Sequence, residues 1–260
     1  MAMHPFRYNF GLYHWRRRLA PIGAAIAAAI LTGAIRRRTD RRSHRVVTIL
    51  IAAGAIARAL RVAHQALSPP PWAIERGKYD ALAARLPLSD ADRVLDVGCG
   101  TGRSLVGLAP HVRPGSEVLG LDVFDDRIIL GNGPALARRN GARAGLTATP
   151  IVGDAARLPV ADDSIDVVTV CRVLHDLDAS DVDRTLRELR RVCRPDGTIG
   201  VLELPLVPDG VSRDPGVYWP ERVSVTGFRI ETLDSIDRDG RDGSYLVLVA
   251  SPSGSDDRDR

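Results

Sequence analysis

The stretch from Val94 to Gly102, with the sequence VLDVGCGTG, constrains the fold more than any other part of the chain. A short apolar run around a single Asp ends abruptly in a turn with three glycines, which is typical of a buried strand followed by a ligand-binding loop. Glycines in such a turn adopt positive φ and let backbone N–H groups approach a ligand closely. Because residues 103–112 are expected to be helical, the sequence predicts a strand, a glycine-rich turn and a helix in direct succession.

Apolar segments and helical patterns alternate after this stretch. Together with residues 93–97, the expected strands are residues 117–123, 149–152, 165–170, 198–204, 228–236 and 244–250. Helices are expected near residues 73–86, 103–112, 134–140, 180–193 and 218–225, with Ser180 capping the fourth and the turn Pro195–Gly197 following it. This alternation predicts an α/β fold with a doubly wound, mostly parallel seven-stranded sheet. The last two strands flank a polar turn, so we expect a C-terminal antiparallel hairpin.

A basic, apolar extension precedes this region. Residues 1–68 contain twelve Arg and one acidic residue, a net charge of +11, whereas the remainder carries 24 basic and 31 acidic residues, a net charge of −7. The overall charge of +4 is therefore no argument for nucleic-acid binding by the main domain, and no nucleic-acid partner is expected. Residues 19–35 form an uncharged run of 17 residues, the lower limit for a spanning helix, and residues 46–57 form a second run.

We expect this extension to associate with a membrane, because arginines and aromatic residues flank its apolar runs. Two crossing helices would place the six arginines between residues 36 and 45 outside the cell, against the positive-inside tendency. One spanning helix followed by an interfacial helix would keep them inside. A soluble helical hairpin packed on the main domain is the third alternative, and the sequence leaves the topology and the oligomeric state open. The expected location is the cell membrane, with the main domain facing the cytoplasm.

The composition also divides the chain into parts. The prolines at residues 69–71 cannot continue a helix and predict a linker over residues 69–72. This linker separates the helical extension, residues 1–68, from a main domain over residues 73–250, and a polar, disordered tail is expected over residues 251–260. The three cysteines are scattered, so no disulfide framework and no metal site is expected.

Several polar residues follow the expected strands, where ligands of an open parallel sheet bind. The glycine spacing G-x-G-x-G and the preceding Asp96 disfavour a nicotinamide-binding loop, in which a third glycine would replace Arg103. Asp122 follows the second strand and suits a ribose, because a carboxylate can accept hydrogen bonds from both vicinal hydroxyls. Asp154 follows the third strand and is placed to accept from an adenine amino group. Arg172, His175 and Glu203 also lie near strand ends.

VLDVGCGTG, followed by GLDV and GDAARLPVADDSIDVVTV, resembles class I S-adenosylmethionine-dependent methyltransferases of the small-molecule type over residues 73–250. The resemblance implies a Rossmann-like fold and S-adenosylmethionine as the cofactor. By motif, the glycine turn would line the methionine end and ribose side, Asp122 would hold the ribose, Asp154 and Ala155 would bracket the adenine, and Cys171 would approach the sulfonium. The cofactor-binding residues implied in this way are Asp96, Gly98, Cys99, Gly100, Thr101, Gly102, Asp122, Val123, Asp154, Ala155 and Cys171.

The leading hypothesis is a membrane-associated methyltransferase that acts on a small or lipidic acceptor, such as a quinone-like ring or a lipid head group. His175 is the candidate catalytic residue, as a general base. A structural or substrate-shaping role is favoured for it, because methyl transfer is largely a matter of alignment. The alternative is a non-enzymatic membrane scaffold that retains the fold. A nicotinamide oxidoreductase is disfavoured by the glycine spacing.

Overall fold

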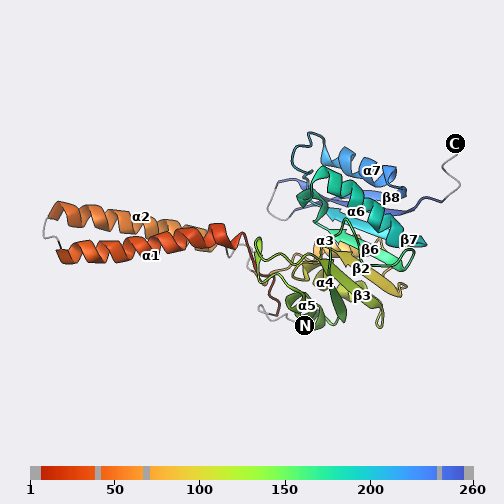
Figure 1. The fold of residues 1–260 in the computed structure, drawn as a ribbon, viewed down its shortest axis with the longest axis horizontal. Coiled ribbons are helices and arrows are strands. Elements are labelled where there is room, and N and C mark those ends of the chain that lie inside the picture. The colour runs from red at the N-terminus through yellow and green to blue at the C-terminus, as the bar shows by residue number, and fades with distance from the viewer. Residues whose placement is uncertain (1–6, 39–41, 67–70, 239–241, 255–260) are drawn as a thin grey trace. The chain divides into compact units, whose positions relative to one another are not determined.

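The structure, a computed structural model, describes residues 7–38, 42–66, 71–238 and 242–254. The chain divides into two compact units (Figure 1). One, the N-terminal unit, comprises Met1–Ala73 and Asp125–Asn132. The other, the α/β unit, comprises Ile74–Phe124 and Gly133–Arg260. A short segment of the expected main domain therefore groups with the N-terminal extension. The expected linker lies partly outside the described residues, and so does most of the expected tail.

The α/β unit is built on a seven-stranded sheet with the order β5-β3-β2-β6-β7-β9-β8. Strands β5, β3, β2, β6 and β7 are parallel, and β9 runs antiparallel to both β7 and β8. The bounds are β2 (Arg93–Val97), β3 (Glu117–Asp122), β5 (Ala148–Val152), β6 (Ile165–Cys171), β7 (Cys193–Glu203), β8 (Phe228–Asp237) and β9 (Ser244–Pro252). The predicted α/β fold, its mostly parallel sheet and its C-terminal antiparallel hairpin are confirmed.

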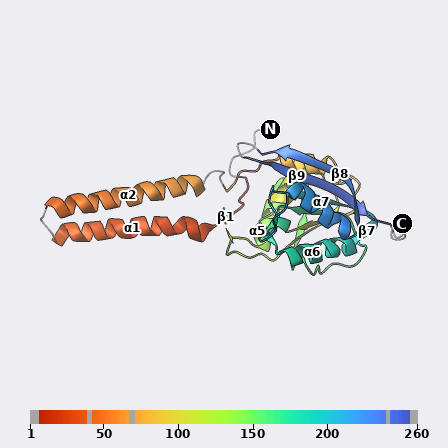
Figure 2. The same ribbon diagram turned by 90° about the horizontal axis from the view of Figure 1, so that it is seen from above.

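Helices cover both faces of this sheet, as Figures 1 and 2 show. They are α3 (Gly77–Ala83), α4 (Arg103–Leu108), α5 (Pro134–Ala144), α6 (Ala179–Val192) and α7 (Pro215–Val225), with 3-10 turns η1 (Ala109–His111) and η2 (Leu174–Asp176). Buried side chains of α6 and α7 pack in one core layer, and those of α3, α4 and α5 pack in the other. Side chains of successive strand residues alternate between the layers: Leu95 lies in the first and Val94 in the second.

Helix α6 illustrates why these residues form this layer. Val182, Leu186 and Leu189 are fully buried and recur every three or four residues, which places them on one helical face. Each such side chain contributes roughly 1.5–3 kcal/mol by leaving water. This stripe, read from the sequence as a helix between about residues 180 and 193, therefore fixes the face that α6 turns toward the sheet.

Several local predictions are wrong or incomplete, including the bounds of most helices. Ser180 does not cap α6, because the helix begins at Ala179 with Asp178 at the N-cap position. Residues 195–197, which were predicted as a turn, lie within β7. The register with β6 is irregular over this stretch, because β7 advances by five residues while β6 advances by two. Strand β3 ends at Asp122, one residue early. Strand β9 continues to Pro252, past the expected start of the tail.

The N-terminal unit contains two long helices, α1 (Trp15–Arg38) and α2 (Arg42–Ala66), which lie side by side in both views (Figures 1 and 2). The Thr32 hydroxyl donates to the carbonyl oxygen of Thr48 at 3.3 Å between them. Segments Trp15–Ile35 and Val46–His64, of 21 and 19 residues, have mean hydropathies of 1.7 and 1.9. Only 6% of the apolar 18-residue stretch in each segment is buried. Both are long and apolar enough to cross a membrane, including the second, whose uncharged run is only twelve residues.

A two-stranded sheet completes this unit. Strand β1 (Leu12–Tyr13) pairs antiparallel with β4 (Ile129–Leu130), which no sequence pattern indicated. The indole N–H of Trp15, the first residue of α1, donates to the carbonyl oxygen of Asp126 at 3.0 Å. The chain that follows β3 is thus tied to the segment that leads into α1.

Candidate functional site

The glycine turn after β2 has a backbone that only glycine suits. Gly98 has a φ of +72°, and a Cβ there would lie 2.2 Å from Cγ2 of Val173. Gly102, at the N-cap position of α4, has a φ of +81°, and its Cβ would lie 2.9 Å from the carbonyl oxygen of Ala137. Positive φ together with these close approaches explains why the motif is so rich in glycine.

Asp122 connects this turn to the end of the neighbouring strand. Its Oδ2 accepts the Gly100 amide at 2.9 Å, and its Oδ1 accepts the Phe124 amide at 2.7 Å. The carbonyl oxygen of Leu121, one residue before, also accepts the amides of Gly98 and Cys99. A carboxylate has about four lone-pair sites, so the chemistry of this group suits the two hydroxyls of a ribose. The predicted convergence of the glycine turn and Asp122 at one sheet edge is found.

Asp96 lies beneath the turn and is 1% exposed. Its Oδ2 accepts the Ser104 hydroxyl at 2.5 Å and its Oδ1 accepts the Thr169 hydroxyl at 2.8 Å. Burial raises the pKa of Asp96 to about 7, although the two hydroxyl donors act in the opposite direction. These contacts make Asp96 a group that fixes the start of α4 relative to β2 and β6, and they are directed to the protein interior.

The other residues of the turn are also packed inward. Cys99 is buried, as expected of a small filler, and burial raises the pKa of its thiol well above the ordinary value. A thiol held in this protonated form is a poor nucleophile. Thr101 is buried, and its carbonyl oxygen accepts the side-chain amide of Asn140 at 2.7 Å, which joins the turn to α5.

The adenine-side candidates lie at the same edge and are more open. Val152, at the end of β5, pairs in register with Asp122, so Asp154 and Ala155 follow at the edge that carries the glycine turn. Asp154 is exposed, and its Oδ1 accepts the Ala156 amide at 2.9 Å. Val123 is 61% exposed. Val123 suits the apolar face of a heterocyclic base, and the Asp154 carboxylate suits an amino group at its edge.

His175 and Glu203 form a buried pair at the ends of β6 and β7. The two side chains are 8% and 0% exposed, and Nδ1 of His175 lies 2.5 Å from Oε2 of Glu203. Burial lowers the pKa of His175, but the Glu203 carboxylate outweighs it, so the pKa lies above its ordinary value. The sequence placed both residues near strand ends without indicating that they touch.

Two residues precede this pair on the same strand end. Cys171 is buried, and its burial raises the pKa of the thiol well above the ordinary value. Arg172 has a φ of +62°, a backbone that non-glycine residues rarely adopt. The Arg172 amide donates to the carbonyl oxygen of Leu202 at 2.7 Å, which holds this conformation at the carboxyl edge of β6.

A pocket of about 240 Å³ opens beside the pair. Its lining combines one imidazole with apolar and acidic side chains, namely His175, Asp176, Leu177, Asp178, Leu206, Val207 and Asp209. The residues from 206 to 209 were not among the predicted site residues, because no sequence pattern marks the segment after β7. Among the described residues, no group of three or more His, Cys, Asp or Glu could hold a metal ion.

Comparisons with known proteins indicate which kind of domain the α/β unit resembles. A family model described as a methyltransferase domain matches residues 94–197, which run from β2 into β7. Demethylmenaquinone methyltransferase from Lactobacillus johnsonii is 34% identical over 119 residues, 46% of this chain and 46% of that protein. The chain spans about half the length of the curated relatives it matches.

Solved structures share the fold at low sequence identity. The [4+2]-cyclase SpnF aligns with a TM-score of 0.55 and 22% identity, over 69% of this chain and 82% of that chain. A SAM-dependent methyltransferase from Aquifex aeolicus aligns with a TM-score of 0.52 and 18% identity, over 66% of this chain and 88% of that chain. One of these is described as a cyclase, so the fold by itself does not define the reaction.

Proposed function

We propose that the α/β unit, a class I S-adenosylmethionine-dependent methyltransferase domain by its fold and family match, methylates a small or lipidic acceptor at a membrane. S-adenosylmethionine carries a methyl group on a sulfonium sulfur and supplies it to a nucleophilic acceptor atom. The chain's own residues would hold the cofactor, exclude water and align the acceptor, which is the main requirement of this transfer.

The observation that carries the proposal is the joined arrangement of the glycine turn and Asp122. The Gly100 amide holds the Asp122 carboxylate at 2.9 Å, and a side chain at Gly98 would collide with Val173. The glycines thus permit the tight packing of the turn, which sets the Gly100 amide beside a fixed carboxylate that suits ribose hydroxyls. Asp154 and Val123 extend the same edge toward the base.

The pocket beside His175 is the candidate acceptor site. Its volume of about 240 Å³ suits a single ring better than a long lipid chain, which would extend outside it. Because Nδ1 of His175 is engaged by Glu203, only Nε2 is available as a proton acceptor. We assign His175 primarily to shaping this pocket, because methyl transfer depends mainly on the alignment of the reacting groups.

A quinone-like ring is the acceptor class that the relatives favour. Demethylmenaquinone methyltransferases are among the proteins similar to part of the α/β unit, and their names specify a quinone substrate. Two apolar helices would keep the domain at the bilayer where prenylated substrates are dissolved, which raises their effective concentration. The proposed location is the cell membrane with the α/β unit on the cytoplasmic side.

Calorimetric titration of the full-length chain with S-adenosylmethionine tests whether the protein binds the proposed cofactor. Wild type is expected to bind, and Asp122→Ala is expected to weaken binding by at least about tenfold, the equivalent of roughly 1.4 kcal/mol. Asp196→Ala, an 86% exposed Asp in β7, is the matched control and should bind normally. Absence of binding, or equal binding by Asp122→Ala, would support the non-enzymatic scaffold instead. Incubation with labelled cofactor and demethylmenaquinone then tests the quinone acceptor.

Membrane association needs a separate experiment. After carbonate extraction of membranes, the full-length chain is expected in the pellet, because two apolar helices hold it there irrespective of charge. Release into the supernatant would contradict an integral extension without affecting the enzymatic proposal. Protease treatment of inside-out vesicles should digest the α/β unit if it faces the cytoplasm.

A further inference from the structure

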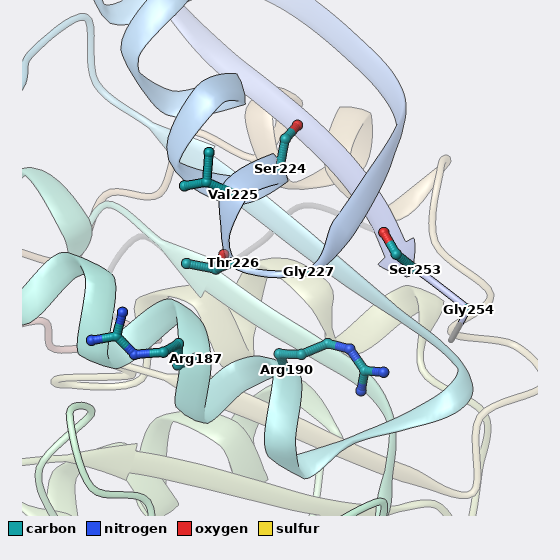
Figure 3. A pocket seen from close by; sticks show the side chains of 8 residues that line it. All are labelled: Arg187, Arg190, Ser224, Val225, Thr226, Gly227, Ser253 and Gly254. Carbon is teal, nitrogen blue, oxygen red and sulfur yellow. The ribbon is translucent and has the colours of Figure 1, made fainter. Parts of the chain in front are cut away.

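A second pocket, of about 550 Å³, lies between α6, the end of α7 and the end of β9 (Figure 3). Figure 3 shows Arg187 and Arg190 on α6 beside the loop that follows α7, with their guanidinium groups extending to opposite sides. The lining residues are Arg187, Arg190, Ser224, Val225, Thr226, Gly227, Ser253 and Gly254. Three hydroxyls and two guanidinium groups thus surround a hollow whose only apolar side chain is a valine.

This pocket is remote from the candidate methyl-transfer site. Arg190 precedes β7, Gly227 precedes β8, and Ser253 follows β9, which is antiparallel to both strands. All three therefore lie at the amino edge of the parallel strands. The glycine turn, Asp122 and His175 lie at the opposite, carboxyl edge. The pocket is not a part of the cofactor or acceptor site.

The two pocket arginines differ from the other arginines of α6. Arg184 pairs with Asp181 at 3.1 Å, and Arg191 pairs with Glu188 and Asp162 at 2.6 Å. Arg187 and Arg190 form no ion pair with any residue that the structure describes. Both therefore remain positive charges without a carboxylate partner at the pocket, in a part of the chain whose net charge from residue 69 onward is −7. Two unpaired cations on an otherwise acidic domain mark a local attraction for anions.

The helix ends nearby weaken this attraction without reversing it. The carboxyl ends of α6 and α7 each carry about half of a negative elementary charge. Two guanidinium groups carry two full positive charges, so the balance at the pocket stays positive. Guanidinium groups and hydroxyls are also the donors that phosphate groups prefer in proteins.

We propose that this pocket binds a small molecule through a phosphate group, at a regulatory or anchoring site separate from methyl transfer. The phosphate would accept hydrogen bonds from Arg187 or Arg190 and from the hydroxyls of Ser224 and Ser253, which all line the pocket. The same chemistry is offered by a soluble phosphorylated molecule and by the head group of an anionic lipid. The volume exceeds what one phosphate needs, so the rest of the ligand has room.

Calorimetric titration of the full-length chain tests the site, with inorganic phosphate and glycerophosphoglycerol as the two probes. Wild type is expected to bind at least one of them with a dissociation constant on the order of 1 mM. The double variant Arg187→Gln/Arg190→Gln should weaken binding by at least about tenfold, whereas Arg184→Gln should bind like wild type. Circular dichroism of each variant checks that the fold is retained.

The two probes distinguish a soluble phosphorylated ligand from the head group of an anionic lipid. Tighter binding of inorganic phosphate supports a soluble phosphorylated ligand, and tighter binding of glycerophosphoglycerol supports a lipid head group. The chain's own Asp256, Asp257 and Asp259 follow the pocket closely in sequence, so the titration is repeated with all three changed to Asn. Binding that appears only in this variant supports the site and identifies these carboxylates as competitors. Absence of saturable binding in both backgrounds, or equal binding by the double arginine variant, overturns the proposal.

Discussion

Nδ1 of His175 lies 2.5 Å from Oε2 of Glu203, while Oε1 of the same carboxylate accepts the amides of Val173 and Leu174 at 2.9 and 2.8 Å. One buried group thus fixes an imidazole ring and the backbone of the loop after β6. Because Val173 also contacts the glycine turn at Gly98, this carboxylate connects the candidate acceptor pocket with the candidate cofactor edge.

Glu203→Gln is expected to lower the pKa of His175. Burial, which favours the neutral imidazole, persists in this variant, whereas the carboxylate that holds the proton is removed. The titration of the His175 ring, followed by NMR, measures the shift. Asp176→Asn is the control, since Asp176 is 79% exposed and its Oδ1 lies 3.5 Å from Nε2, so its effect should be smaller. An unchanged pKa in Glu203→Gln would show that the pair is not coupled.

The same pair makes part of the stability depend on pH. The folded-state pKa of His175 is raised, so its stabilising contribution is complete below its ordinary pKa of 6.5 and is lost as the pH rises through the folded-state value. His175→Gln should therefore cost more free energy of unfolding at pH 5.5 than at pH 8.5. Urea denaturation at both pH values measures the difference. A larger cost at pH 8.5 would contradict the direction of the shift.

The protonation of Asp96 should change the stability of the fold with pH in the opposite direction to that of an ordinary ion-paired carboxylate. Its pKa rises from 3.8 to about 7 on folding, so the native state holds the proton more tightly than the unfolded chain. Stability from this group is therefore greatest at low pH and declines between these two values, by at most about 1.4 kcal/mol per pH unit. Because Asp96→Asn does not titrate there, the advantage of wild type over this variant should shrink from pH 5 to pH 8 in urea denaturation. A constant difference would argue against the shift.

Gly98→Ala is expected to abolish cofactor binding and to lower stability by about 1–3 kcal/mol through backbone strain and overpacking. Gly115 is the matched control: it has a φ of +93° but nothing within 4 Å of its added Cβ. Gly115→Ala should show only the cost of positive φ and should leave binding unchanged. Since the obstacle at Gly98 is the Val173 side chain, the double variant Gly98→Ala/Val173→Ala should recover part of the loss. Calorimetry and thermal unfolding measure both effects, and normal binding by Gly98→Ala would refute the close-approach argument.

The sequence predicted correctly the elements that are specified by short-range patterns of apolar residues. Strand β2 was predicted at its observed bounds, and α6 was found because its buried stripe repeats with helical spacing. The predicted strand and helix ends were less accurate: Ser180 has the chemistry of a cap, but the chain enters α6 one residue earlier, at Ala179. The turn residues before β7 also have turn chemistry, yet pairing with β6 holds them within the strand.

By itself, the sequence determined that the glycine turn, Asp122 and Asp154 belong to one edge, because parallel strands bring their carboxyl ends together. Only the tertiary structure decided what each residue contacts. Asp96, which the motif places with the ligand, is directed inward to two hydroxyls, and Glu203, at the end of β7, contacts His175, 28 residues away in sequence. Such contacts depend on the register between elements distant in sequence. Periodicity along the chain predicts which face of an element is buried, but it does not specify how elements that are distant in sequence are aligned with one another.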